Sequence, residues 1–82
     1  MSAIWGNRAE IARQDNMIRE AIDTRPAALH LSKRAFARRL GMSEDTLARR
    51  YKRPEDLTLA ELRKLCAAMG WSADKAKEVL FG

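Results

Sequence analysis

Basic residues gather in one short segment of this chain, between positions 33 and 53. That segment holds eight Lys and Arg residues against Glu44 and Asp45, a balance of +6. The other 61 residues hold eight basic and nine acidic residues, a balance of −1. A solvated surface usually mixes the two signs, so this concentration of positive charge indicates a polyanionic partner. The basic residues are Lys33, Arg34, Arg38, Arg39, Arg49, Arg50, Lys52 and Arg53.

Few other residues have the types and spacing that catalysis or metal binding needs. Cys66 is the only cysteine, which excludes an intramolecular disulfide and a cysteine-based metal site. His30 has no Cys or carboxylate at metal-ligand spacing, so we expect a loop or core histidine. Paired catalytic carboxylates, a nucleophile with a histidine and a phosphate-binding glycine loop are also missing. We therefore expect no enzyme, no metal, no cofactor and no small-molecule ligand.

The elements that position the basic residues are expected to be helices. A chain of 82 residues suits one compact domain, and we expect residues 1–82 to form it. Alternating β-branched runs are missing, whereas helix start and stop signals recur, so the expected fold is all-α. The predicted helices span about 8–23, 33–40, 44–52, 59–69 and 73–80, and residues 1–6 are candidates for disorder. Without an apolar run of about 18 residues or an N-terminal leader, we expect a cytoplasmic protein without a membrane span.

Four of the helix starts share one signature, an apolar residue followed by a Ser or Thr cap. The cap hydroxyl can accept from a backbone N–H, and the apolar residue can pack on another five positions later. Thr58 and Glu61 also match a capping box, and Asn7 with Glu10 resembles a cap pair for the first helix. The four starts are Leu31–Ser32, Met42–Ser43, Leu57–Thr58 and Trp71–Ser72.

Glycine and proline mark the predicted helix ends. Gly41 and Gly70 can take the left-handed conformation that closes a helix. Pro54 predicts that the third helix ends just before it. Pro26 predicts that the first helix ends near residue 23 or 24, because proline disfavours helical geometry in the residue before it.

Apolar residues at helical spacing predict the core. Cys66 is expected to be a small buried residue of the core, and Trp71 is expected to be a core residue as well. Trp5 and Phe81 lie near the chain ends, where they fit either packing on the core or a dimer contact. One face of the first helix is expected to present Ile11, Ile18, Ala21 and Ile22.

Residues 33–52 predict a helix-turn-helix. Two helices of about two turns each, joined by a link as short as 41–43, must cross steeply. Ala37 supplies the small residue that this crossing needs, with Phe36 and Leu40 beside it. Ala37, Gly41 and Leu47 stand at the offsets that the motif requires.

A helical wheel indicates which side of helix 44–52 is available to a partner. Leu47 and Tyr51 define its buried side, and Asp45, Arg49 and Lys52 fall almost opposite. Arg49 is the expected base-reading residue, since a guanidinium can bind guanine O6 and N7 with two hydrogen bonds. Four other basic residues are expected to contact phosphates, and these are Arg34, Arg38, Lys52 and Arg53.

Residues 31–53, LSKRAFARRLGMSEDTLARRYKR, resemble the lambda-repressor-like (Cro/repressor, XRE-type) family of phage and bacterial regulators. Residues 57–62, LTLAEL, and 67–70, AAMG, are similar to that family's fourth helix, so the resemblance covers about 50 of the 82 residues. In such proteins the third helix enters the major groove, and the start of the second lies against phosphates. The resemblance implies phosphate contacts from Lys33 and Arg34. It implies base contacts from Ser43, Glu44, Asp45 and Arg49.

Two features depart from that family. Arg50 stands where many members have an apolar residue, and Tyr51 beside it is expected to take the core position. Glu44 and Asp45 are acidic where DNA would come closest. They can complement the positive end of the helix, accept from cytosine N4, or hold Arg49 through an i, i+4 pair from Asp45. They also fit a partner other than DNA.

The sequence thus predicts a sequence-specific regulator of transcription that binds double-stranded DNA, most simply a repressor that occupies a promoter within the nucleoid. A single motif covers only a short half-site, which favours a homodimer on two half-sites one DNA turn apart. The alternative is a phage- or bacteria-encoded protein-interaction module, such as a host-defence inhibitor. Its basic helix-turn-helix face would then contact an acidic protein.

Overall fold

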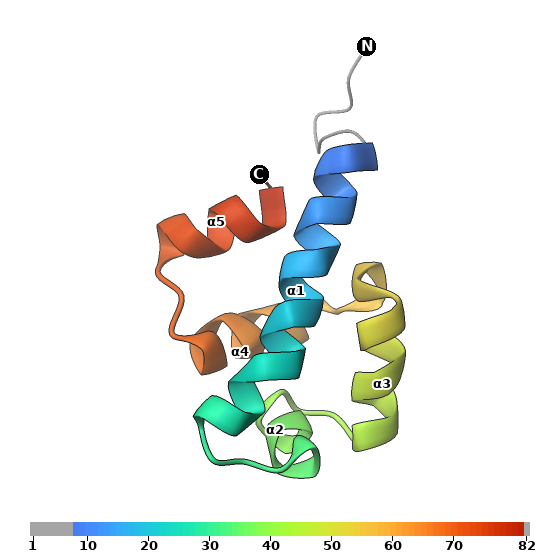
Figure 1. Cartoon of the computed structure of the whole chain (residues 1–82), viewed down its shortest axis with the longest axis vertical. Helices are drawn as coiled ribbons and strands as arrows, with labels where there is room; N and C mark the ends of the chain where they lie inside the picture. Colours follow the sequence, from blue (N-terminus) through green and yellow to red (C-terminus); the bar gives the residue numbers. More distant parts are fainter. Residues whose placement is uncertain (1–7, 82) are drawn as a thin grey trace.

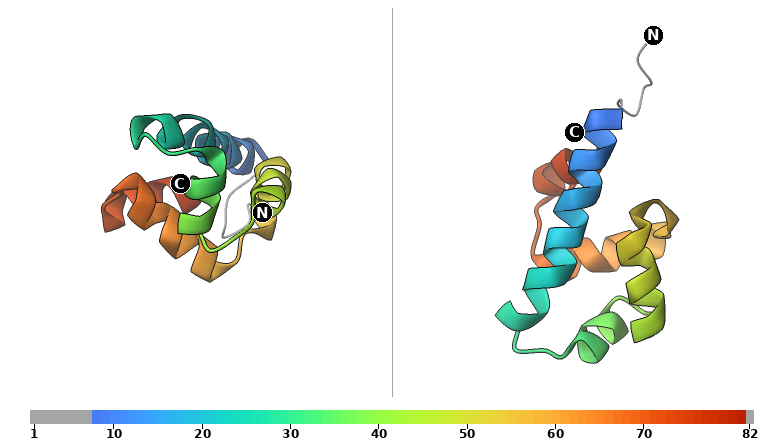
Figure 2. Two further views of the ribbon diagram at one scale, coloured as in Figure 1. Left: turned by 90° about the horizontal axis from the view of Figure 1, so that it is seen from below. Right: turned by 45° about the vertical axis from the view of Figure 1, so that its right-hand side comes forward.

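The computed structural model describes residues 8–81 and consists of helices throughout. The elements are α1 (Arg8–Ala28), α2 (Lys33–Arg39), α3 (Glu44–Lys52), the 3-10 helix η1 (Pro54–Asp56), α4 (Leu59–Met69) and α5 (Ala73–Phe81). No strand occurs in this range, so the all-α, five-helix prediction is confirmed. α1 is about 31 Å long at 1.5 Å per residue, and the shorter helices are arranged around it (Figures 1 and 2).

One apolar core joins the five α-helices. Phe36, Ala37 and Val79 have no exposed surface, and Leu40 and Leu65 are 1% exposed. Full burial of a Val, Leu or Phe side chain contributes about 1.5–3 kcal/mol to the stability of the fold. The rest of the cluster consists of Ile18, Ile22, Met42, Leu47 and Leu57. The predicted motif core of Phe36, Ala37, Leu40 and Leu47 therefore lies at the centre of the fold.

Three core predictions need adjustment. Ile11 is 45% exposed, because it precedes the part of α1 that the other helices cover, so it does not share the buried face. Trp71 packs against the core but is only partly buried. Cys66 is half-buried, and burial raises the pKa of its thiol. Phe81 is 56% exposed, and Trp5 lies outside the described residues.

The predicted helix starts are confirmed by their hydrogen bonds. In each case the cap hydroxyl accepts from the backbone N–H three residues later, at 3.1–3.2 Å. At α4 the carboxylate of Glu61 also accepts from the N–H of Thr58, which completes the capping box. The four caps are Ser32, Ser43, Thr58 and Ser72. Asn7 lies outside the described residues, so its predicted cap is not described.

Three helices end in the same way, with a left-handed residue just beyond the last turn. Gly41 at φ 77° and Gly70 at φ 67° take this position, as predicted. His30 at φ 56° takes it after α1, although it carries a side chain. At each end the next residue donates its N–H five positions back, for example from Met42 to Ala37 O at 3.0 Å. These bonds satisfy carbonyl groups that a helix end otherwise leaves unpaired.

The predicted end of the first helix was wrong. α1 continues through Pro26 to Ala28, because the proline removes only the one N–H donor that would pair with Ile22. The ring of Pro26 is buried, and its carbonyl accepts from the N–H of Leu31 at 2.8 Å. The helix therefore stops at left-handed His30 and not at proline.

None of the described helices has both the length and the apolar composition that spanning a bilayer requires.

Candidate nucleic-acid interface

The junction of α2 and α3 positions the candidate site. α2 ends at Arg39 with Leu40 as its C-cap, Gly41 makes the left-handed turn, and the Ser43 hydroxyl caps α3. Ala37, with no exposed surface, lets the two helices cross closely. A Cβ at Gly41 would stand 2.7 Å from the Lys64 amino group, and its φ of 77° is itself unfavourable for a side chain. The geometry is that of the predicted helix-turn-helix.

The outer side of α3 is open. Leu47 is 3% exposed and faces the core, whereas Asp45, Ala48, Arg49 and Lys52 are exposed. The right-hand view of Figure 2 shows α3 at the right-hand edge of the molecule, with α1 and α4 on its left-hand side. In the described part of the chain, no other helix covers this outer side. The surface is therefore free to meet a partner along about 13 Å of helix.

A short chain of hydroxyl groups sets the direction of Arg49. Its guanidinium donates to Thr46 Oγ1 at 3.2 Å, and Ser43 Oγ donates to the same oxygen at 3.0 Å. The ion pairs of the described residues do not include one between Asp45 and Arg49, so the alternative in which Asp45 holds Arg49 is not formed there. Ser43 also accepts from the N–H of Thr46, so only one acceptor position of its hydroxyl remains. Thr46 is a site residue that the sequence reasoning missed.

Two of the eight clustered basic residues form ion pairs within the chain. Arg50 Nε lies 3.0 Å from Glu61 Oε1, with side chains only 22% and 14% exposed. This ion pair explains why an arginine stands at a position expected to be apolar. Arg53 lies 3.7 Å from Glu55 and 3.6 Å from Asp56 on the exposed surface. Exposed pairs of this length contribute little, so Arg53 can exchange its partners for a phosphate.

Glu61 is the anion that joins α3 to α4. Burial acts to raise the pKa of its carboxyl, but the Thr58 N–H and the Arg50 guanidinium outweigh burial and lower the pKa below 4.5. Its carboxylate oxygen accepts from Thr58 N at 2.9 Å and from Arg50 at 3.0 Å. The carboxylate is therefore ionised at neutral pH, which keeps both contacts in place.

A groove separates the exposed side of α2 from the first turn of α3. It encloses about 430 Å³ and is lined by Arg34 and Arg38 on one side and by Ser43, Glu44 and Asp45 on the other. Arg34 and Arg38 stand one turn apart, so both project from the same face of α2. The structure thus brings together cationic and anionic members of the predicted set across one groove.

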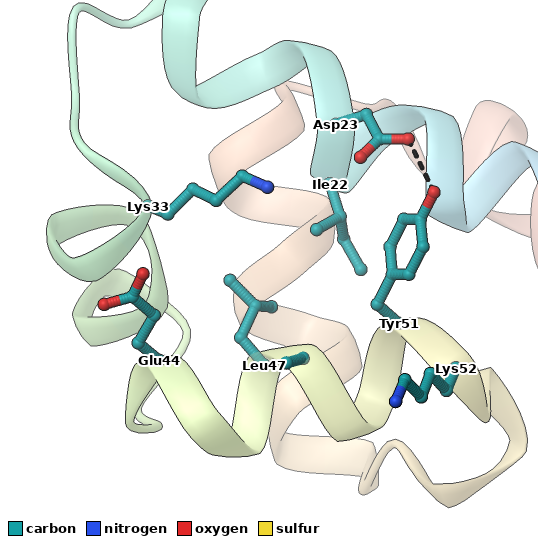
Figure 3. Close-up of a pocket in the computed structure, with 8 residues that line it drawn as sticks. Ile22, Asp23, Lys33, Glu44, Leu47, Tyr51 and Lys52 are labelled. Atoms are coloured by element: carbon teal, nitrogen blue, oxygen red, sulfur yellow. Dashed lines mark hydrogen bonds between the residues drawn. The ribbon is translucent and has the colours of Figure 1, made fainter.

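A second cleft, of about 330 Å³, lies between α1, α2 and α3 (Figure 3). Its walls include Ile22 and Leu47, and the Lys33 amino group points across it toward α1. On the far wall the Tyr51 hydroxyl donates to Asp23 Oδ2 at 2.7 Å. This bond is the main reason that the pKa of the Tyr51 phenol lies above 10.0. Tyr51 is partly buried against the core, as expected from the wheel.

The side chains of His30 and Cys66, which could bind a metal or act as nucleophiles, lie outside this surface. His30 is exposed at the end of α1, and Cys66 is half-buried on α4. Within residues 8–81 no three His, Cys, Asp or Glu side chains gather closely enough to hold a metal ion. Arg19 of α1 is a further contributor that sequence reasoning missed, because its contacts are to backbone carbonyls 32 and 33 positions away.

Comparison with known proteins agrees with this geometry. The family model of the Cro/C1-type HTH DNA-binding domain matches residues 22–72, which include the whole of α2, α3 and α4. No significant match was found among curated proteins or among solved structures. The matched segment carries the buried Ala37, the left-handed Gly41 and the open side of α3. The chain therefore belongs to the family of Cro/C1-type helix-turn-helix DNA-binding domains, the family that its sequence resembles.

Proposed function

We propose that this DNA-binding protein is a sequence-specific transcriptional repressor that inserts α3 into the major groove. The observation that carries the proposal is the open side of α3, where Arg49 and Lys52 are exposed. The basic face of α2 flanks this surface with Arg34 and Arg38. Since α3 is about the width that the major groove admits, its outer residues would reach base edges.

Arg49 is the proposed centre of base recognition. Its guanidinium is held by a neutral hydroxyl, so contact with guanine O6 and N7 requires no ion pair to be broken. Glu44 and Asp45 would accept from cytosine N4, and Ser43 has one acceptor position left for a base or a bridging water. The proposed phosphate contacts are Lys33, Arg34, Arg38, Lys52 and Arg53.

The repressor and dimer proposals follow from the size of the interface. A single α3 covers a short half-site, and two copies on half-sites one DNA turn apart would multiply the discrimination. A dimer bound across a promoter would exclude the polymerase without a further activity. A reporter whose promoter overlaps the selected operator tests this step, and undiminished expression at saturating protein contradicts repression.

Selection from a random duplex library with the purified protein tests the recognition itself. We expect an enriched palindrome whose half-site contains the guanine read by Arg49. Arg49→Ala should lower discrimination at that position by about 1–3 kcal/mol. Lys52→Ala should weaken all duplexes alike and reduce the log–log salt slope by about 0.9. No enrichment, or equal effects of the two substitutions on discrimination, contradicts this assignment.

A second candidate is favoured by one observation, the two exposed acids at the start of α3. Glu44 and Asp45 would repel phosphates but could pair with basic residues of a protein partner. In this candidate the chain is an interaction module, such as an inhibitor of a host-defence complex, and its arginines contact acidic residues of the partner. Substitution of both acids by Gln and Asn distinguishes the two. A changed base preference in the half-site, with duplex binding retained, would show that the acids face DNA and would remove the reason for this candidate.

A further inference from the structure

Arg19, on α1, contacts the end of the proposed recognition helix with two of its three nitrogen atoms. Its Nε donates to the carbonyl of Tyr51 at 2.9 Å, and its Nη2 donates to the carbonyl of Lys52 at 3.1 Å. The third nitrogen, Nη1, donates to Asn16 Oδ1 at 3.1 Å. The guanidinium is therefore held by Asn16 of α1 and by two carbonyl groups at the end of α3.

These contacts suit the chemistry of a helix end. The last carbonyl groups of a helix have no intrahelical donor and carry a partial negative charge, so a guanidinium there makes charge-assisted hydrogen bonds. Two hydrogen bonds from one planar group to successive carbonyls restrict direction as well as distance. α1 reaches the same turn a second time, since Tyr51 donates its hydroxyl to Asp23 at 2.7 Å.

We propose that Arg19 is a positioning residue for base recognition, because it sets the angle of α3 in the groove. This inference rests on the proposed function. α3 is about 13 Å long, and its first turn is held by the Ser43 cap, so a rotation of about 5° moves its last turn by about 1 Å. Recognition groups tolerate an error of about 0.5 Å. A base contact of Arg49 would be lost, whereas flexible lysines such as Lys52 would still reach phosphates.

The chain provides a matched control in Arg25. It lies on the same helix, and its Nε donates to the carbonyl of Ala68 at 3.0 Å, close to the end of α4. Arg19→Met and Arg25→Met thus each remove one guanidinium from α1, with two helix-end hydrogen bonds lost in the first variant and one in the second. Only the hydrogen bonds lost in the first variant involve the helix proposed to read bases. A general loss of stability would affect both variants, whereas a change of α3 orientation would affect one.

The experiment compares wild type, Arg19→Met and Arg25→Met on the selected operator duplex and on a scrambled duplex. We expect Arg19→Met to lower the ratio of the two affinities by about tenfold. A loss of this size lies within the range of discrimination that one base contact provides. Its affinity for the scrambled duplex should stay within about twofold of wild type, because phosphate contacts position without specifying. Arg25→Met should leave the ratio unchanged.

Hydrogen exchange without DNA provides a separate readout. The amide of Arg53, which donates to Arg49 O at 3.0 Å, should exchange faster in Arg19→Met and not in Arg25→Met. If Arg19→Met does not fold, Arg19→Lys is used, and its single ammonium should give an intermediate ratio.

Several outcomes overturn the inference. An unchanged ratio, an equal loss in both variants, or an equal loss on both duplexes shows that Arg19 does not act through the angle of α3. A wild-type protein that shows no preference between the duplexes refutes the proposed function instead. In that case the exchange result still decides whether Arg19 holds the end of α3, so the two failures are distinguishable.

Discussion

Removal of the Glu61 carboxylate should destabilise the fold more than loss of a helix cap alone. Glu61→Ala deletes the capping-box acceptor of Thr58 N, which is worth about 1 kcal/mol. It also leaves Arg50, with a side chain only 22% exposed, without its partner at 3.0 Å. A hydrogen bond to a charged group is worth about 1.5–3 kcal/mol, and partial exposure reduces this to about 1–2 kcal/mol. The expected total is about 2–3 kcal/mol.

Thermal unfolding measures this difference directly. A domain of this size loses about 4–8 °C of Tm per kcal/mol, so Glu61→Ala should lower the Tm by about 10–20 °C. Thr58→Ala is the control, since it removes a cap acceptor and keeps the Arg50 pair, and it should cost about 1 kcal/mol. Arg50→Met combined with Glu61→Ala should cost less than the sum of the two single substitutions. Equal Tm values for Glu61→Ala and Thr58→Ala would refute the role assigned to the ion pair.

Three further predictions follow from the described contacts. Because the pKa of Glu61 is lowered in the folded state, its carboxylate stabilises the fold above pH 4.5, and this stabilisation is lost as the pH falls through the folded-state pKa. Glu61→Gln should therefore flatten the acid limb of a curve of Tm against pH. A limb of unchanged steepness would contradict this. Ala37→Leu should cost about 3 kcal/mol or more, because Ala37 has no exposed surface at the crossing of α2 and α3, and an unchanged urea midpoint would show that the crossing is misassigned. His30→Gly should stabilise by up to about 1 kcal/mol, since the residue holds φ 56°, and a lower Tm would show that the imidazole contributes more than the backbone costs.

The signals that could be predicted from the sequence are local. A cap hydroxyl accepts from an N–H only three residues later. A left-handed residue directly follows the last turn of the helix that it ends. Ser43, Thr58, Gly41 and Gly70 were therefore predicted correctly. The end of α1 was missed because Pro26 was given the weight of a stop signal, although a proline in the last turn of a helix removes only one hydrogen bond.

The contacts that could not be predicted are those between elements far apart in the chain. Arg50 and Glu61 are separated by 11 positions, and Arg19 and Tyr51 by 32. No pattern within either helix indicates such a pair, since arginines also occur on solvated faces. The net charge of residues 33–53 therefore overstates the charge open to a partner, because Arg50 is paired with Glu61. The Thr46–Arg49 contact is the exception, because its i, i+3 spacing was visible in the sequence.

The reach of Arg19 also affects how this protein can be re-engineered. A chimaera built by transplanting only residues 31–53 into another scaffold would carry the side chains of α3 without the guanidinium that holds its final turn. The acceptor protein would then need its own donor opposite the carbonyls of Tyr51 and Lys52. The smallest portable unit of this molecule is thus discontinuous in sequence, and it includes part of the first helix.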